Sequence, residues 1–251
     1  QNDDLLLIKK LLAQLGKTPF YKKEKPTPYD EAVSLIWYLE NVFYESVSKI
    51  YNYIQNNIYD GNPMDNEIID LGFWPGGDRD GNPFVTTKIT LDVAERLRQS
   101  ILRSYYRDVR RLKRRFTFDG VQEVLSKIEK RLYKHVVRSY SKVNFSQDIF
   151  LDELAKARKI IAEKHQSLFI EELDDFINKV RIFGFHFATL DIRQDSRVHH
   201  KAFTQIVKDL QHTGDTTFPK NYEFLDEDEQ IEILAVVKGS IDPKMLTDDT
   251  S

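Results

Sequence analysis

The feature that most constrains the fold of this chain is a pair of short apolar segments, far apart in a sequence otherwise patterned for helices. EIIDLGFW at 67–74 has adjacent β-branched residues and runs into a glycine-rich loop, and RIFGFHFATLDIR at 181–193 is bulky and apolar without helical spacing. Both patterns predict strands. The second favours a strand covered on both faces, as in a parallel sheet. Because two strands do not form a sheet that is stable alone, we expect partner strands from a longer polypeptide.

Helical periodicity fills most of the remaining sequence. Residues 3–15 carry apolar side chains at three- and four-residue steps, and the prolines of KTPFYKKEKPTP predict an exposed connection after them. One long helix is predicted over 30–58, and further helices are predicted over 91–116 and from 121 to about Tyr140. One or two helices are predicted within 147–181, and one over 196–213. The last predicted helix lies near 225–239, where Gly239 would be the C-terminal cap.

The apolar positions of these helices predict which faces are buried. In the first helix they are Leu5, Ile8, Leu12 and Leu15. In the 30–58 helix they are Ala32, Leu35, Ile36, Leu39, Val42, Phe43, Val47, Ile50 and Ile54. Within 147–181 they are Leu151, Leu154, Ala155, Ile160, Ile161, Leu168, Phe169, Leu173, Phe176 and Ile177.

Composition excludes several classes of protein. With 41% hydrophobic residues the chain can bury an ordinary core, so disorder is not expected. The 37 basic and 40 acidic residues leave a net charge of −3, so no overall field attracts nucleic acid or an acidic membrane. The absence of cysteine excludes disulfides and thiolate metal sites. No apolar run has the length of a membrane span, and we expect a cytoplasmic protein, cut from a longer one because it opens at Gln1.

The loop GGDRDGNP at 76–83 is the first candidate site, because glycine-rich loops at strand ends hold unusual backbone angles and present polar groups. A rigid turn in which Arg79 pairs with Asp78 or Asp80 explains the same composition. A calcium loop is disfavoured, because the closing glutamate and central glycine of an EF-hand are missing. The candidate residues are Gly76, Gly77, Asp78, Arg79, Asp80 and Asn82.

The second candidate site is DIRQDS at 191–196, which places Arg193 and Gln194 at the exit of the second predicted strand. The planar guanidinium suits a phosphate or carboxylate, which it can bind through two parallel hydrogen bonds. An ion pair of Arg193 with Asp191 or Asp195 is the alternative.

The basic stretch 103–115 (RSYYRDVRRLKRR), with two tyrosines among its arginines, is a third candidate site, for an acidic or nucleic-acid partner or a sugar phosphate. A solvated helix face with acidic partners on neighbouring helices is favoured, because the chain as a whole is acidic. Adjacent His199 and His200 point in different directions on a helix, so we expect exposed side chains rather than a metal-ligand pair.

Four segments resemble the bacterial and plant phosphoenolpyruvate carboxylases. GFWPGGDRDGNPFVT resembles the glycine-rich signature of that family, and LDIRQDSRVH is similar to a second signature in the same order. IWYLENVFYESVSKI at 36–50 and the pattern around LDEDEQIEIL support the match. The resemblance extends over nearly the whole chain and is weak through 115–180.

This resemblance implies a lyase with a helix-rich (β/α)8 barrel of the TIM type. Such an enzyme adds a carboxyl group from bicarbonate to phosphoenolpyruvate, with Mg²⁺ or Mn²⁺, and gives oxaloacetate and phosphate. The reaction is anaplerotic carbon dioxide fixation for the tricarboxylic acid cycle, in an allosteric cytoplasmic enzyme that is a homo-tetramer. The family match further implies that Arg193, with Gln194 beside it, binds the substrate phosphate, and that Asp78 and Arg79 line or brace the mouth of the site.

Several parts of the family pattern do not occur in this sequence. The TAHPTE segment with the catalytic histidine is missing, and so are the segments with the metal-binding carboxylates, the further phosphate arginines and the mobile glycine-rich loop. We therefore expect one internal fragment with roughly two of eight barrel strands, which has no catalytic residue, binds no metal and is inactive alone. Its expected parts are helical 1–66, strand and signature loop 67–90, a helical insertion 91–180, strand and signature 181–197, and helical 198–251. A helical binding module that uses 103–115 is the alternative function.

Overall fold

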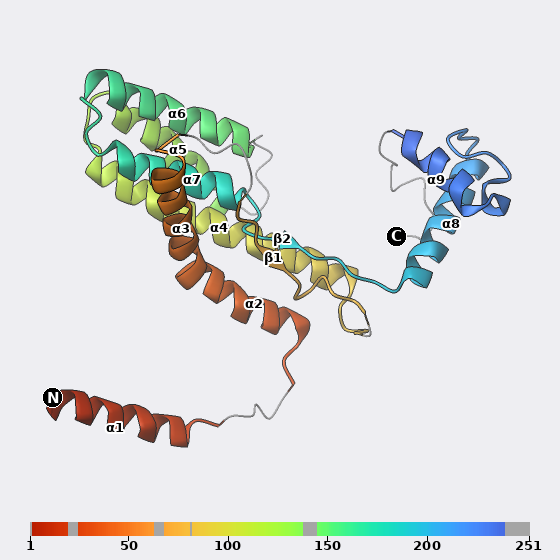
Figure 1. The fold of residues 1–251 in the computed structure, drawn as a ribbon, viewed down its shortest axis with the longest axis horizontal. Helices are drawn as coiled ribbons and strands as arrows, with labels where there is room; N and C mark the ends of the chain where they lie inside the picture. Colours follow the sequence, from red (N-terminus) through yellow and green to blue (C-terminus); the bar gives the residue numbers. More distant parts are fainter. Residues whose placement is uncertain (1, 20–24, 63–67, 81, 138–144, 239–251) are drawn as a thin grey trace. The chain divides into compact units, whose positions relative to one another are not determined.

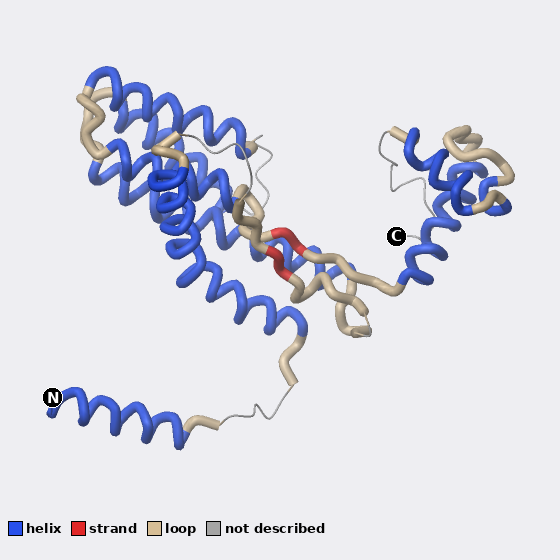
Figure 2. Tube along the Cα trace, viewed as in Figure 1, coloured by secondary structure: helices blue, strands red, loops and turns tan. Residues whose placement is uncertain are grey.

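The computed structural model describes residues 2–19, 25–62, 68–80, 82–137 and 145–238. The described part is mostly helical with one pair of short parallel strands, which confirms the predicted mostly helical class (Figure 2). The chain divides into two compact units. The first consists of 1–77 and 83–191, and the second of 78–82 and 192–251.

Four long helices form the body of the first unit (Figure 1). They are α4 (Thr87–Arg115), α5 (Val121–Val137), α6 (Gln147–Lys164) and α7 (Ile170–Phe183). Each contacts two of the others, in the order α4, α5, α6, α7 and back to α4. Their shared core is fully buried and includes Val93, Leu97, Ile101, Leu125, Ile128, Leu154, Ala157, Phe176 and Val180. Leu154 and Phe176 are buried, as the apolar pattern of 147–181 predicts.

Local capping sets where the helices begin. Thr86 and Ser146 accept hydrogen bonds from the third residues of α4 and α6, and Thr27 forms a capping box with Asp30. Such caps satisfy backbone donors that have no partner within the helix. The helix α1 (Asn2–Lys17) confirms the predicted helix near 3–15, although its apolar residues Leu5, Ile8, Leu12 and Leu15 are exposed.

The predicted helix over 30–58 is interrupted, and part of its predicted buried face is wrong. It consists of α2 (Pro28–Tyr38), the π-helical turn η1 (Leu39–Phe43) and α3 (Tyr44–Ile58). A π turn adds one residue, which rotates everything after it relative to the α-helical stripe. The buried stripe therefore continues from Leu39 to Tyr44 rather than to Phe43. Val42, Phe43 and Ile50, all predicted to be buried, are instead exposed.

Both predicted strands are much shorter than the sequence indicates. β1 is Gly72–Phe73 and β2 is Thr189–Leu190, paired in parallel with Gly72 opposite Thr189 and Phe73 opposite Leu190. Most of 181–193 is not a strand, because α7 continues to Phe183 and a turn follows. The bulky phenylalanines of this segment fill the helical core, where Phe183 and Phe187 pack on the ring of Tyr44.

The connection between α6 and α7 corrects another prediction. Leu168 and Phe169 lie in this turn and are exposed, although the sequence pattern placed them on a buried face. Ala155 of α6 is also exposed. The pattern misses the turn because apolar residues flank it without a glycine or proline to mark it.

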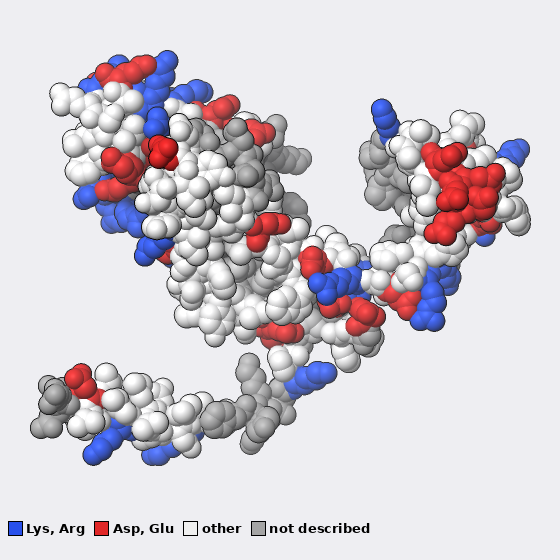
Figure 3. Space-filling model, in the orientation of Figure 1, with Lys and Arg blue, Asp and Glu red and all other residues white. Residues whose placement is uncertain are grey.

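The second unit contains α8 (Ser196–His212), the short 3₁₀ helix η2 (Tyr222–Phe224) and α9 (Glu227–Val236). Its small core consists of Val207, Leu210, Phe218 and Tyr222. Asp226 and Glu229 form a capping box at the start of α9, and acidic side chains gather on this unit (Figure 3). The predicted cap Gly239 lies outside the described residues.

No helix among the described residues is long and apolar enough to cross a membrane.

Candidate functional site

In the first unit, the two glycines after β1 allow close backbone approach. A side chain at Gly77 would put its Cβ 2.1 Å from the backbone oxygen of Asp191, the residue that follows β2. Gly76 has a φ of +83°, and a Cβ there would meet the side chain of Val93 at 2.6 Å. Thr90 of α4 donates from Oγ1 to the backbone oxygen of Gly76, at 2.7 Å. Only glycine fits both positions, so the loop backbone lies tight against β2 and α4.

In the second unit, the rest of the first signature runs beside the second one. Asp78 and Arg193 form an isolated parallel bridge, and the amide of Arg79 donates to the backbone oxygen of Arg193 at 2.9 Å. The Asp78 carboxylate accepts from the amide of Asp80 at 3.2 Å, and the amide of Asn82 donates to the backbone oxygen of Arg79 at 3.1 Å. The two candidate segments, distant in sequence, are therefore hydrogen-bonded neighbours.

The candidate side chains differ in accessibility. Arg193, Asp80 and Asn82 are exposed, whereas Asp78 and Arg79 are half-buried. The half-buried Gln194 accepts from the amide of Asp195 through its Oε1, at 2.9 Å. Arg193 thus presents its side chain at the surface of the second unit.

Asp195 has a structural role at the start of α8. Its carboxylate accepts from the amide of Arg197 at 2.8 Å and pairs with the Arg197 guanidinium at 2.6 Å. The hydrogen bonds from the Arg197 side chain, followed by that from its amide, hold the pKa of Asp195 below its ordinary value. Asp195 therefore acts as an N-cap. His199 and His200, farther along the same helix, are exposed as predicted.

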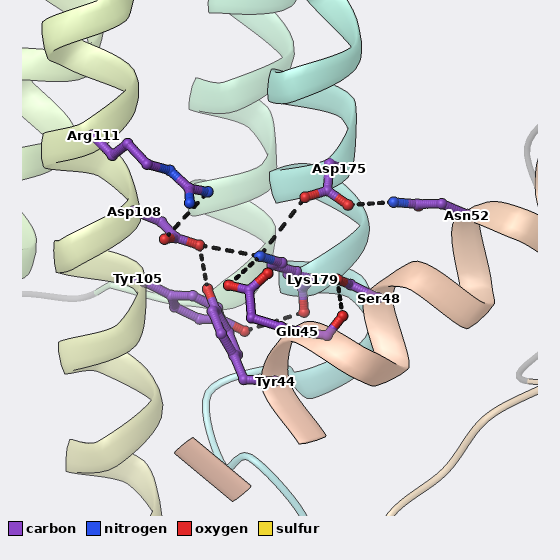
Figure 4. Close-up of polar contacts among 9 residues, drawn as sticks. All are labelled: Tyr44, Glu45, Ser48, Asn52, Tyr105, Asp108, Arg111, Asp175 and Lys179. Carbon is purple, nitrogen blue, oxygen red and sulfur yellow. Dashed lines mark hydrogen bonds and ion pairs between the residues drawn. The ribbon is translucent and has the colours of Figure 1, made fainter. Parts of the chain in front are cut away.

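A buried polar cluster that was not predicted lies between α3, α4 and α7 (Figure 4). Lys179 is fully buried, and its Nζ lies 2.9 Å from Glu45 Oε1, 3.5 Å from Asp108 Oδ2 and 3.7 Å from Asp175 Oδ2. The Tyr44 hydroxyl donates to Asp108 at 2.9 Å. Burying a charge is costly, so a lysine persists here because three carboxylates compensate it.

This cluster perturbs the two tyrosines beside it. Burial, followed by the charge of Asp108, raises the pKa of Tyr44 and of Tyr105 well above the ordinary value of 10.0. One sequence signal for the cluster existed, since Lys179 follows Phe176 by three residues and precedes Phe183 by four. A lysine on an apolar helix face indicates a buried partner.

A polar cavity of about 630 Å³ borders the cluster at Asn52 and Asp175. Its polar groups largely bind one another, since Asn52 donates to Asp175, and Asn178 donates to Asn52 and Gln55 at 2.8 Å each. These bonds connect α3 with α7, so the arrangement stabilises the contact between the two helices.

Several side chains of the basic stretch 103–115 form ion pairs within the first unit. Arg110 and Lys113 both pair with Glu129 of α5, at 3.6 and 2.7 Å, and Arg115 pairs with Glu172 of α7 at 2.7 Å. Tyr105 is fully buried rather than displayed on the surface.

No metal site is found in the part of the chain that the structure describes. Within the described ranges, no group of three or more histidine, aspartate or glutamate side chains is arranged to hold a metal ion. Asp78 and Asp80, the carboxylates of the first signature, are joined instead by the hydrogen bond between the Asp80 amide and the Asp78 side chain.

Comparison with known proteins identifies relatives of this chain. A sequence model of the phosphoenolpyruvate carboxylase family matches residues 3–148 and 121–241. A phosphoenolpyruvate carboxylase of Shewanella halifaxensis is 25% identical over 237 residues, which cover 82% of this chain and 27% of the relative. Enzymes of the same name from Vibrio vulnificus and Aeromonas salmonicida are each 26% identical over 234 residues, covering 81% of this chain and 27% of the relative.

This chain therefore spans about a quarter of the length of these relatives. The family model covers far more than half of the chain, including both signature segments and the helices between them. This match shows that the chain belongs to the phosphoenolpyruvate carboxylase family.

Proposed function

We propose that this chain is an internal part of a phosphoenolpyruvate carboxylase, and that it contributes Arg193 to the binding of the substrate phosphate. The observation that carries the proposal is the parallel pairing of β1 with β2, after which the candidate segments 76–83 and 191–196 follow. The carboxyl ends of parallel strands lie at one edge of a sheet, where the active sites of (β/α)8 barrels are built. We infer that strands from outside this chain complete such a barrel.

The Arg193 side chain suits the proposed role. It is exposed, and its segment is fixed through the backbone by the hydrogen bond that its carbonyl accepts from Arg79. A guanidinium can donate two parallel hydrogen bonds to a phosphate. Because the Oε1 of Gln194 is occupied by the Asp195 amide, the Nε2 of Gln194 is the group we assign to the substrate. Asp78 and Arg79 brace the Arg193 backbone.

The chemistry explains why a fixed cation is useful. An oxygen of bicarbonate bonds to phosphorus as the bond from phosphorus to the enol oxygen breaks, which gives carboxyphosphate and the enolate of pyruvate. The enolate carbon then bonds to the carboxyl carbon, which gives oxaloacetate and releases phosphate. Negative charge stays on the phosphoryl oxygens throughout, and a preorganised cation beside them stabilises the transition state.

The remaining functional groups come from other parts of the complete enzyme. The family segments that carry the metal-binding carboxylates and the catalytic histidine do not occur in this sequence, so we assign the ligands of Mg²⁺ or Mn²⁺, and that histidine, to segments outside this chain. The isolated chain is then inactive. A cytoplasmic homo-oligomer, a tetramer with allosteric control as in the family, is part of the same proposal.

The test compares Arg193→Ala with Arg197→Ala in the complete polypeptide that contains this chain, by following oxaloacetate formation. Removing a charge-stabilising donor of this kind costs about 10²–10³ in rate, so Arg193→Ala should lower kcat/KM for phosphoenolpyruvate by that factor. Arg197 is a matched control, because it is exposed and pairs with Asp195. If Arg193→Ala keeps the KM and kcat of the parent, the phosphate role is wrong.

A further inference from the structure

The β1–β2 ladder is too short to set its own register. It contains two residue pairs, Gly72 with Thr189 and Phe73 with Leu190. A slip by one residue would reverse the faces of both side chains of β2, and would also move Asp191, where the second signature begins. Something outside the ladder must therefore define where β2 starts.

The turn that leads into β2 has an unusual backbone. Gly184, which ends α7, has φ +52° and ψ −142°. Phe187 has a φ of +70°, in the left-handed region, although it is not glycine and is almost fully buried. Residues other than glycine persist in this region only where the surrounding structure holds them.

Tyr105 of α4 holds the start of this turn. Its fully buried hydroxyl donates to the backbone oxygen of Gly184 at 2.7 Å and lies 3.4 Å from that of Lys179. On the other side, Gln147 of α6 donates to the backbone oxygen of Val180 at 3.0 Å. Two neighbouring helices thus fix the last carbonyl groups of α7 and the residue after it.

The aromatic side chains hold the end of the turn. Phe187 packs edge-on against Phe183 and Tyr44, with ring centres 5.2 and 6.1 Å away. Tyr44 is fixed in turn by its hydrogen bond to Asp108, which also contacts Lys179. Figure 4 shows Tyr44 and Tyr105 extending from different helices toward this polar cluster. The strained turn is therefore held at both ends by the buried core.

We propose that Tyr105 is a positioning residue, which sets the register of β2 through the carbonyl of Gly184. The amides of Thr189 and Asp191 bond to the backbone oxygens of Leu71 and Phe73, at 2.8 Å each, and depend on this register. The consequence for substrate rests on the proposed function, because Arg193 follows Asp191 by two residues.

The test is amide hydrogen exchange, measured by mass spectrometry with single-residue resolution on the complete polypeptide that contains this chain, with Tyr105→Phe. The variant keeps the ring and removes the hydroxyl. Loss of one buried hydrogen bond predicts about tenfold faster exchange at Thr189 and Asp191, with the amides of α5 and α6 unchanged. Tyr106→Phe is the matched control, since no hydrogen bond of the Tyr106 hydroxyl is found within the described structure.

A second variant keeps the test decisive if Tyr105→Phe fails to fold. Gly184→Ala leaves Tyr105 intact but strains the turn, because alanine disfavours this φ and its Cβ would lie 2.9 Å from the His186 ring. The same selective acceleration at Thr189 and Asp191 is expected. Unchanged exchange at these two amides, or equal acceleration throughout the first unit, overturns the proposal.

Kinetics of the complete enzyme separate this proposal from the proposed function. Tyr105→Phe should raise the KM for phosphoenolpyruvate by up to about tenfold while kcat changes less, because the binding groups are displaced but retained. If Arg193→Ala has no effect but exchange is still selective, only the phosphate role fails. If Arg193→Ala is impaired but exchange is not selective, only the positioning role fails.

Discussion

The α4–α7 bundle and the β1–β2 ladder of the first unit are stabilised in different ways. Each helix of the bundle buries a periodic apolar stripe and contacts two neighbours. The ladder has two residue pairs. It depends on the close approach of Gly77 to Asp191 and on the turn between α7 and β2. The bundle is therefore held by many buried contacts, whereas the ladder is held by a few.

The largest effect is expected inside the bundle, where Lys179→Ala would leave Glu45, Asp108 and Asp175 without their shared cation. Breaking a buried ion pair from one side costs about 3–5 kcal/mol, so the free energy of unfolding should fall by that amount in urea titrations. Lys156→Ala, on the exposed side of α6, is the control and should change it by less than about 0.5 kcal/mol. A loss below 1 kcal/mol for Lys179→Ala would show that the cluster does not stabilise the bundle.

Gly77→Ala tests the ladder directly. Its Cβ would lie 2.1 Å from the Asp191 backbone oxygen, so the strands must separate at this end. Overpacking of this kind costs about 1–3 kcal/mol, and the amide of Asp191 should exchange faster than those of α5. Gly72→Ala, in β1 itself, has open space around its Cβ and serves as the control. If Gly77→Ala and Gly72→Ala change stability and exchange of the Asp191 amide equally, the close approach of Gly77 to Asp191 does not hold the ladder.

The buried tyrosines predict an alkaline limit to the stability of the bundle. In the unfolded chain Tyr44 loses its proton near the ordinary pKa of 10.0, whereas in the folded protein its pKa is raised by burial and by Asp108. The stabilisation is complete below about pH 10 and is lost as the pH rises toward the folded pKa. Tyr44→Phe should therefore flatten the fall of stability above pH 10, unlike the exposed Tyr53→Phe. Equal pH profiles for both variants would falsify this explanation.

The smallest effect is expected at the surface of the bundle. Arg115 is about half exposed and pairs with Glu172 at 2.7 Å. Exposed pairs contribute about 0–1 kcal/mol, so Arg115→Ala should lower the free energy of unfolding by no more than that, and by less in 1 M salt. A loss that does not change with salt would instead implicate packing of the Arg115 side chain on Phe169. The guanidinium carbon of Arg115 lies 4.5 Å from the centre of the Phe169 ring.

Sequence patterns identified the helices well and the strands poorly, for a physical reason. Helical periodicity is local, so α4, α5 and α8 lie close to the predicted ranges, and α6 lies within the predicted helical region 147–181. The π turn at Leu39–Phe43 has no local signal, and it moved Phe43 from the core to the surface. The phenylalanines of 181–193 are apolar in either conformation, and the packing of Phe187 against Tyr44 decided that most of this segment is not a strand.

The sequence by itself determined the helical class, the family resemblance and the two signature segments, because these depend on residue identity and short-range spacing. Only the tertiary structure decided that Arg79 donates to the Arg193 carbonyl, that Gly77 meets Asp191 and that Lys179 is buried among three carboxylates. Except for the pair of Lys179 with Asp175, which lie one turn apart on α7, these contacts join residues far apart in the chain. Their geometry follows from how the helices pack, which no local pattern contains.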